Sequence, residues 1–155
     1  MRLADEVSIR PLPASSDNEP PRSAVLLGGR DSGAVVAGRV LEAAVEADGR
    51  YLLFLTDDTP YEELLHLCLL DGQGHALDSA TLGGPYATGH FSGPRLLDGQ
   101  RVGFGFIDDK DWEVELLPTA RLRLPLWSEP KGVWRARPLR CHFVLRARPR
   151  AAIPS

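Results

Sequence analysis

The chain of 155 residues has only two cysteines, Cys68 and Cys141, and neither belongs to a C-x-x-C pair or another metal-ligand spacing. We therefore expect buried free thiols rather than a disulfide or a structural metal site. Long apolar runs are also missing. The run from Leu64 to Leu70 is interrupted by His66 and falls far short of the roughly 20 residues that span a bilayer. The N-terminal residues lack the apolar core of a secretory signal, which predicts a cytoplasmic protein without a membrane anchor.

Acidic residues are scarce at the C-terminal end. Residues 119–155 hold nine of the 18 Lys and Arg but one of the 21 Asp and Glu. These basic residues alternate with apolar ones, so we expect a basic strand paired with acidic strands. Aromatic and basic residues also mix in this region, as in proteins that bind single-stranded nucleic acid, but the acidic remainder of the chain disfavours that function. The mixed residues are Trp127, Lys131, Trp134, Arg135 and Arg137.

Three Asp-Gly dipeptides separate runs of apolar residues typical of strands. They are Asp48-Gly49, Asp71-Gly72 and Asp98-Gly99. Asp-Gly between such runs is a strong hairpin signal, because both turn residues must tolerate a positive φ. The first turn predicts that Val45 pairs with Leu52 and Ala43 with Phe54.

The segments around these turns alternate as strands do. Residues 34–47 would also suit a helix, but we predict a strand because Leu41, Ala43, Val45 and Ala47 alternate with other residues. Residues 50–56 and 64–70 are apolar on both faces, which predicts central strands covered on each side. A last strand is expected over residues 140–148.

A further hairpin is predicted from Trp112 to Leu126. Its turn would lie at residues 118–120 and would place Glu115 opposite Arg123. Pro125 cannot donate a backbone hydrogen bond, which predicts an edge strand there.

These patterns predict an all-β fold, an antiparallel sandwich or partly closed barrel of about nine strands joined by short hairpins, with little or no helix. The composition is ordinary for a globular protein, and residues 24–150 are expected to form one β domain. Residues 11–23 contain four prolines, so we expect residues 1–23 to be a loose arm. Residues 151–155 are expected to be a tail.

An acidic segment follows the strand predicted over residues 50–56. It contains Asp57, Asp58, Glu62 and Glu63. Paired carboxylates could serve a hydrolase as general acid and base, but the segment lacks the glycine and final glutamate of a calcium-binding EF-hand loop. We expect a solvated turn or a negative surface that contacts a partner.

A second long connection, residues 83–93, combines glycines with Tyr86, His90 and Phe91. Aromatic residues on such a loop serve recognition or close the end of a β core. No Gly-Lys-Ser/Thr follows, which disfavours a phosphate-binding loop. A zinc site in which His66 and Cys68 share a strand face is conceivable, but no ligand spacing supports it.

Residues 51–63, Tyr-Leu-Leu-Phe-Leu-Thr-Asp-Asp-Thr-Pro-Tyr-Glu-Glu, and residues 83–89, Gly-Gly-Pro-Tyr-Ala-Thr-Gly, resemble small bacterial β proteins similar to immunity partners of polymorphic toxins. The resemblance covers residues 51–126, about half of the chain, and includes no catalytic or ligand motif. It implies a stoichiometric binder that blocks access to its partner.

Together these observations predict a non-catalytic cytoplasmic protein-binding module, with no cofactor or metal and with another protein as its partner. The candidate contacts are Asp57, Asp58, Glu62, Glu63, Tyr86, His90 and Phe91. One alternative is a β-barrel that carries a small apolar ligand in a cavity lined by Phe104, Phe106 and Trp112. The other is a hydrolase that uses the acidic segment.

Overall fold

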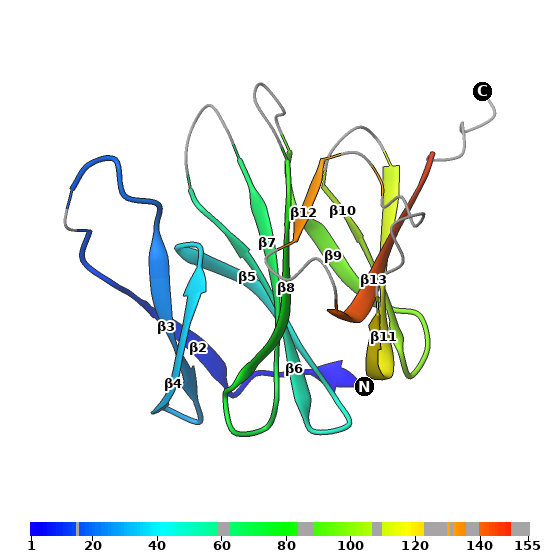
Figure 1. Cartoon of the computed structure of the whole chain (residues 1–155), viewed down its shortest axis with the longest axis horizontal. Helices are drawn as coiled ribbons and strands as arrows, with labels where there is room; N and C mark the ends of the chain where they lie inside the picture. Colours follow the sequence, from blue (N-terminus) through cyan, green and yellow to red (C-terminus); the bar gives the residue numbers. More distant parts are fainter. Residues whose placement is uncertain are drawn as a thin grey trace.

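The computed structural model describes residues 1–14, 16–58, 63–83, 89–106, 110–122, 130, 132–135 and 140–149. These residues contain strands and no helix, so the predicted all-β class is confirmed (Figure 1). The strands are β1 (Arg2–Leu3), β2 (Val7–Pro11), β3 (Arg22–Leu27), β4 (Arg30–Ala37), β5 (Val40–Ala47), β6 (Arg50–Thr56), β7 (Leu65–Leu70), β8 (Ala76–Leu82), β9 (Ser92–Leu96), β10 (Arg101–Gly105), β11 (Lys110–Leu122), β12 (Val133–Arg135) and β13 (Arg140–Pro149).

The strands form three antiparallel sheets stacked as layers. A six-stranded sheet, in the order β1-β5-β6-β7-β8-β12, lies between a three-stranded sheet, β2-β3-β4, and a four-stranded sheet, β13-β11-β10-β9 (Figure 1). The described residues form no closed barrel, and the three sheets form a layered sandwich. The structure has thirteen strands rather than about nine, because short edge strands such as β1 and β12 carry too little sequence pattern to be predicted.

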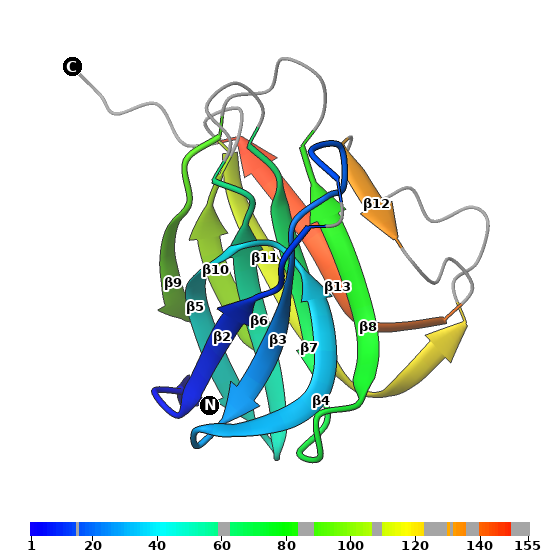
Figure 2. The same ribbon diagram turned by 90° about the vertical axis from the view of Figure 1, so that its left-hand side faces the viewer.

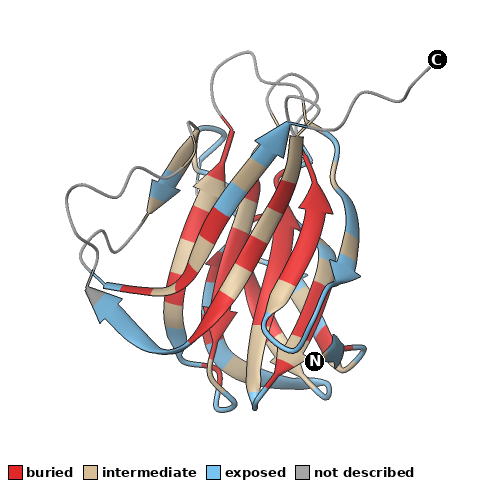
Figure 3. Ribbon diagram, turned by 90° about the vertical axis from the view of Figure 1, so that its right-hand side faces the viewer, coloured by how far each residue is buried: buried red, intermediate tan, exposed pale blue. Residues whose placement is uncertain are grey.

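Two apolar cores separate the three layers. Leu52 and Phe54 face the four-stranded sheet, whereas the alternate residues Leu53 and Leu55 face the three-stranded sheet. All four side chains are fully buried. The prediction that this central strand is covered on both faces is therefore confirmed. Figure 3 faces the four-stranded sheet and shows buried residues alternating with more exposed ones along its strands.

The Asp-Gly turns join β5 to β6, β7 to β8 and β9 to β10, all at the lower end of Figure 1. Asp48 and Gly49 have φ values of 52° and 76°, as the predicted turn requires. Val45 pairs with Leu52 and Ala43 with Phe54, which confirms the predicted register.

The segment 34–47 contains strands, as predicted, but two of them. β4 ends at Ala37, and β5 begins at Val40. Gly38 between them has a φ of 115°, and a Cβ on Gly38 would lie 2.6 Å from Cβ of Leu55. The chain therefore turns between two layers at a position where a side chain does not fit.

The prediction of a loose arm over residues 1–23 is wrong for its first half. β1 pairs with β5, and β2 pairs with β3. Val7 and Ile9 pack on the core beneath the three-stranded sheet and alternate with Ser8 and Arg10, a strand pattern that the nearby prolines obscured.

The predicted hairpin from Trp112 to Leu126 is also wrong. β11 continues through Pro118 to Leu122, and its pairing with β13 shifts register between Leu116 and Arg121. The proline lies within this irregularity, where a strand tolerates a residue without an N–H. Glu115 consequently lies opposite Arg101 and Val144. Its predicted partner Arg123, together with Leu124, Pro125 and Leu126, lies outside the described residues.

Candidate functional site

Two of the predicted contact residues have partners within the fold, the buried Asp57 and the half-buried Phe91. The Asp57 side chain is 10% exposed, and its Oδ1 lies 2.8 Å from Nε2 of His66. The Phe91 ring packs on the rings of Phe54 and Phe104, at centroid distances of 5.3 and 6.1 Å. Asp57 is therefore held by an internal partner, and Phe91 closes the end of a core, so neither is available as a primary contact.

Three predicted contact residues lie nearer to solvent. Asp58 and His90 are exposed, and Glu63 is half-buried. The backbone of Glu63 adjoins Gly83, because a Cβ on Gly83 would lie 3.2 Å from the carbonyl oxygen of Glu63. The bases of the two long connections thus meet at one end of the fold. Glu62 and Tyr86 lie outside the described residues.

Asp57 is part of a polar chain on one face of the six-stranded sheet. The His66 ring contacts Asp57 through Nε2 and the Thr81 hydroxyl through Nδ1, at 2.8 and 2.9 Å. In neutral histidine, Nε2–H donates to the carboxylate and Nδ1 accepts from the hydroxyl. A carboxylate, an imidazole and a hydroxyl in series also occur in hydrolases, which in addition need a substrate site. The four hollows described below are lined by none of these residues, and the contacts within the polar chain satisfy the half-buried His66 ring and the buried Asp57 carboxylate.

The thiols show no sign of a reactive or ligating role. Cys68 and Cys141 are both buried, and neither thiol belongs to a disulfide. Burial raises the pKa of the Cys68 thiol to about 12, because the thiolate would lose its hydration. The described residues contain no group of three His, Cys, Asp or Glu side chains that could hold a metal ion.

A buried ion pair within the six-stranded sheet makes hydrogen bonds to β13 of the four-stranded sheet. Arg135 on β12 and Asp78 on β8 are 3% and 0% exposed, and Nη1 of the arginine lies 2.9 Å from Oδ2 of the aspartate. Asp78 also accepts the backbone N–H of His142, and Arg135 donates to the carbonyl of Phe143 and lies over its ring. Arg135 is therefore committed to the fold and cannot track phosphates, whereas its neighbour Trp134 is 70% exposed.

Among the described residues, most ion pairs between strands lie on the outer face of the four-stranded sheet. On β11, Glu115 lies opposite Arg101 of β10, and Glu113 lies opposite Arg146 of β13. Arg146 approaches Glu115 to 3.1 Å, and Arg101 approaches Glu113 to 3.2 Å. The predicted pairing of a C-terminal basic strand with an acidic strand is thereby confirmed.

Two glycines form the floor of a groove on this face. Gly103 and Gly105 on β10 point outward, since Val102, Phe104 and Phe106 alternate with them in the core. Two hollows of about 520 and 260 Å³ lie over these glycines and share Arg95 and Asp111 in their walls. We call this region the glycine groove. It is defined by Arg95, Leu97, Gly103, Gly105, Asp111 and Arg148.

In the sequence, Gly103 and Gly105 alternate with apolar residues inside a predicted strand, a pattern that indicates close approach or sharp coiling but identifies neither the groove nor its arginines. The outward orientation of Gly103 and Gly105 could be predicted from the sequence, because three apolar residues alternate with them. Arg95 and Arg148 come from strands far apart in the sequence, so only the sheet order brings them to one groove.

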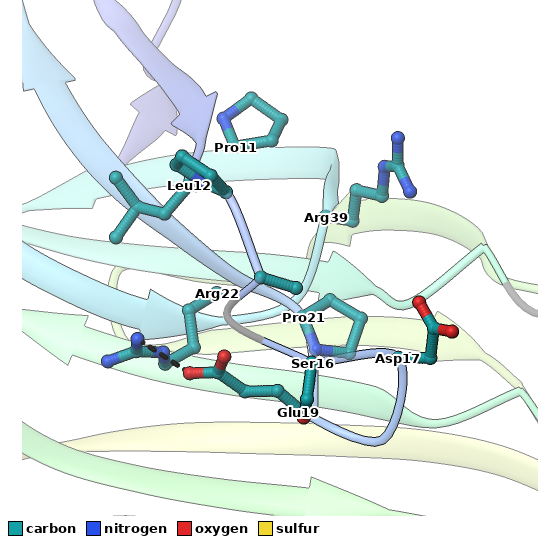
Figure 4. A pocket seen from close by; sticks show the side chains of 10 residues that line it. Pro11, Leu12, Ser16, Asp17, Glu19, Pro21, Arg22 and Arg39 are labelled. Atoms are coloured by element: carbon teal, nitrogen blue, oxygen red, sulfur yellow. Dashed lines mark hydrogen bonds and ion pairs between the residues drawn. The ribbon is translucent and has the colours of Figure 1, made fainter.

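Another hollow, of about 860 Å³, lies under the connection between β2 and β3 (Figure 4). Its walls include Leu12, Pro21 and Arg39, together with an ion pair between Arg22 and Glu19. A fourth hollow, of about 570 Å³, lies between β4 and the turn that joins β7 to β8. The rings of Phe104 and Trp112 pack together at 6.3 Å, so the space that an apolar ligand carrier would need is filled by the core.

No helix of the described residues is long and apolar enough to cross a membrane. No family model matches the sequence, and neither the curated proteins nor the solved structures include a match. The case for a function therefore comes from the surface of the molecule.

Proposed function

We propose that this chain is a non-catalytic protein-binding module that docks its partner on the outer face of the four-stranded sheet, at the glycine groove. The observation that carries the proposal is the pair of outward glycines, Gly103 and Gly105, in the interior of a sheet. Glycine weakens a strand by about 0.5–1 kcal/mol relative to alanine and often marks a site where another backbone approaches closely.

The fold itself does not need a glycine at position 103. Gly103 is not among the residues with a positive φ. A Cβ at this position would lie 3.4 Å from Nη2 of Arg95 and 3.5 Å from Cδ1 of Leu97, which are ordinary contacts with flexible side chains. A glycine at position 103 lowers the stability of the strand, and the backbone conformation does not require it. This favours a role in binding.

The charges along the groove favour a partner whose contacting surface is acidic. The side chains that point outward from this sheet include four arginines and three carboxylates: Arg95, Arg101, Arg146, Arg148, Asp111, Glu113 and Glu115. Among the residues that the structure describes, no carboxylate pairs with Arg148, and Arg95 stays 3.8 Å from Asp111. Both guanidinium groups therefore keep donors for a partner's carboxylates.

More specifically, the proposed module is an immunity-type inhibitor that binds a bacterial toxin, and the inhibitor is located in the cytoplasm. Its support is the resemblance of residues 51–126 and a rigid sheet face that can occlude a partner without moving. Asp58, Glu63 and His90 at the loop end remain predicted contacts for the same partner.

The experiment compares complexes recovered with affinity-tagged variants from the cells that naturally express the chain. We expect the wild type to recover one stoichiometric protein, and Gly103→Val to lose it because the valine fills the groove. Gly99→Ala is the matched control, since Gly99 lies in the adjacent turn with open space around it. The proposal is wrong if the wild type recovers no partner, or if Gly103→Val recovers as much partner as Gly99→Ala does.

A further inference from the structure

A second surface lies on the opposite side of the molecule, at the outer edge of the three-stranded sheet. β4 is the last strand of that sheet and, among the described residues, pairs with β3 alone. Figure 2 faces this sheet and shows β4 as its strand nearest to β8. We call the segment Ala34–Ala37 the β4 edge.

The β4 edge presents unpaired backbone groups. The N–H of Gly38 donates to the carbonyl of Pro21 beside β3, so by the alternation of a strand Val36 faces β3 as well. Val35 and Ala37 therefore direct their N–H and C=O groups away from the sheet. No hydrogen bond within the described residues uses these groups.

This edge lacks the usual protection against strand pairing. Natural edge strands are kept from pairing by charged side chains, proline or very short length. β1 and β12 have two and three residues, β2 ends in Pro11, and β13 carries Arg146 and Arg148. The β4 edge has the sequence Ala-Val-Val-Ala, and the Val35 side chain is exposed by 52%.

Space for an added strand exists beside the edge. The hollow of about 570 Å³ is lined by Ser32–Val35 on one side and by Gly74–Ala76 on the other. Gly74 approaches Ser32 so closely that a Cβ on Gly74 would lie 2.7 Å from Cβ of Ser32. The turn between β7 and β8 thus closes the hollow at Ser32, and the β4 edge continues from there toward Ala37.

We propose that the β4 edge binds an extended, acidic-flanked peptide segment of a partner protein by strand addition. Arg30 and Arg39 stand at the two ends of β4, and no ion pair within the described residues engages either side chain. Figure 4 shows Arg39 beside the hollow of about 860 Å³ under the β2–β3 connection, where Arg22 is already paired with Glu19. Backbone hydrogen bonds would provide affinity, and carboxylates at both ends of the segment would fix its position.

A second copy of the chain fits this edge poorly. Antiparallel pairing of two β4 strands through Val35 would place Arg39 of one copy opposite Asp31 and beside Arg30 of the other. Arg10 already engages Asp31, so positive charge is in excess at this end, and like charges across a strand pair repel. The charges at the ends of the strand therefore favour a different, acidic partner segment over self-association.

The test is fluorescence anisotropy with labelled nine-residue peptides and the full chain. The peptide Asp-Asp-Val-Thr-Val-Thr-Val-Asp-Asp should bind saturably, and the same peptide with lysine flanks should bind at least about tenfold more weakly. Val35→Pro should abolish binding, because it removes an N–H that the fold leaves free. Val35→Thr keeps that N–H and should bind as the wild type does.

Three results would overturn the inference. They are an absence of binding by the acidic peptide, equal binding by Val35→Pro, and a dimer in sedimentation that Val35→Pro dissociates, which would make a second copy the occupant. Thermal melting of both Val35 variants shows whether they fold. Gly103→Val should leave peptide binding unchanged, so that failure at the β4 edge and failure at the glycine groove are distinguishable.

Discussion

The substitution Gly103→Val should make the protein more stable, which is unusual for a change in the interior of a strand. Most substitutions destabilise, and an added side chain in a packed sheet costs free energy when it clashes. Gly103 lies on the outer face of β10, where Arg95 and Glu113 are its cross-strand neighbours. A valine there would meet the flexible ends of Arg95 and Leu97 and, beyond them, solvent.

The expected gain follows from backbone entropy and strand propensity. Replacing a glycine with a residue that has a Cβ recovers about 0.5–1 kcal/mol, and β propensities in a host protein span about 1 kcal/mol in total. We therefore expect Gly103→Val to raise the free energy of unfolding by about 1 kcal/mol. For a chain of this length the melting temperature should rise by about 2–4 °C.

Urea denaturation followed by fluorescence measures this change, and two variants provide comparisons. Gly38→Ala should lower the free energy of unfolding by more than about 1 kcal/mol, because Gly38 has a φ of 115° and no room for a Cβ. Gly99→Ala should change it little, since nothing lies within 4 Å of its Cβ position. If Gly103→Val loses as much stability as Gly38→Ala does, the fold requires this glycine and the argument for the groove fails.

Three further predictions concern the ionisable groups. Asp78→Ala should lower the free energy of unfolding, measured in urea, by about 3 kcal/mol, because Arg135 loses a buried carboxylate at 2.9 Å. A loss below about 1 kcal/mol, typical of an exposed ion pair, would contradict this. The Cys68 thiol, with a pKa of about 12, should react with a disulfide reagent at pH 8 only after unfolding, measured in a variant whose other cysteine is serine. Arg2 holds the pKa of Glu6 at about 2, below its ordinary 4.5, so this contribution to stability is complete above pH 4.5 and is lost as the pH falls through 2. Arg2→Gln should move the carboxyl titration of Glu6, followed by NMR, back toward 4.5, and an unchanged midpoint would refute the pairing.

The sequence predicted the parts of the fold that local chemistry determines. Asp48-Gly49 sets the register of β5 and β6, because two residues that tolerate positive φ leave one favoured hairpin. The apolar faces of β6 predict burial on both sides for the same local reason. Pro118, in contrast, predicted a turn. A strand can contain this proline only because the pairing of β11 with the distant strand β13 is irregular there, and the local sequence does not reveal that pairing.

The candidate site was harder to predict than the fold. Asp57 looked like a surface carboxylate, but its neighbour His66 lies on another strand, and only the sheet register brings the two together. Arg95 and Arg148 reach the glycine groove from β9 and β13, the two edges of one sheet. Alternation along a strand indicates which way a side chain points, but not which distant side chain it meets.

Site-directed photo-crosslinking tests the central claim, that the partner docks on the glycine groove, most directly. A photo-reactive amino acid would replace Leu97, which lines the groove and is 48% exposed, or Leu3 on β1 of the six-stranded sheet, which is 51% exposed and does not line the groove. Because the two positions expose a leucine to a similar extent, nonspecific crosslinking should be similar at both. We expect the variant at position 97 to crosslink to the co-purified partner and the variant at position 3 not to do so. Crosslinking at position 3 alone, or equally at both positions, would contradict the proposed docking surface.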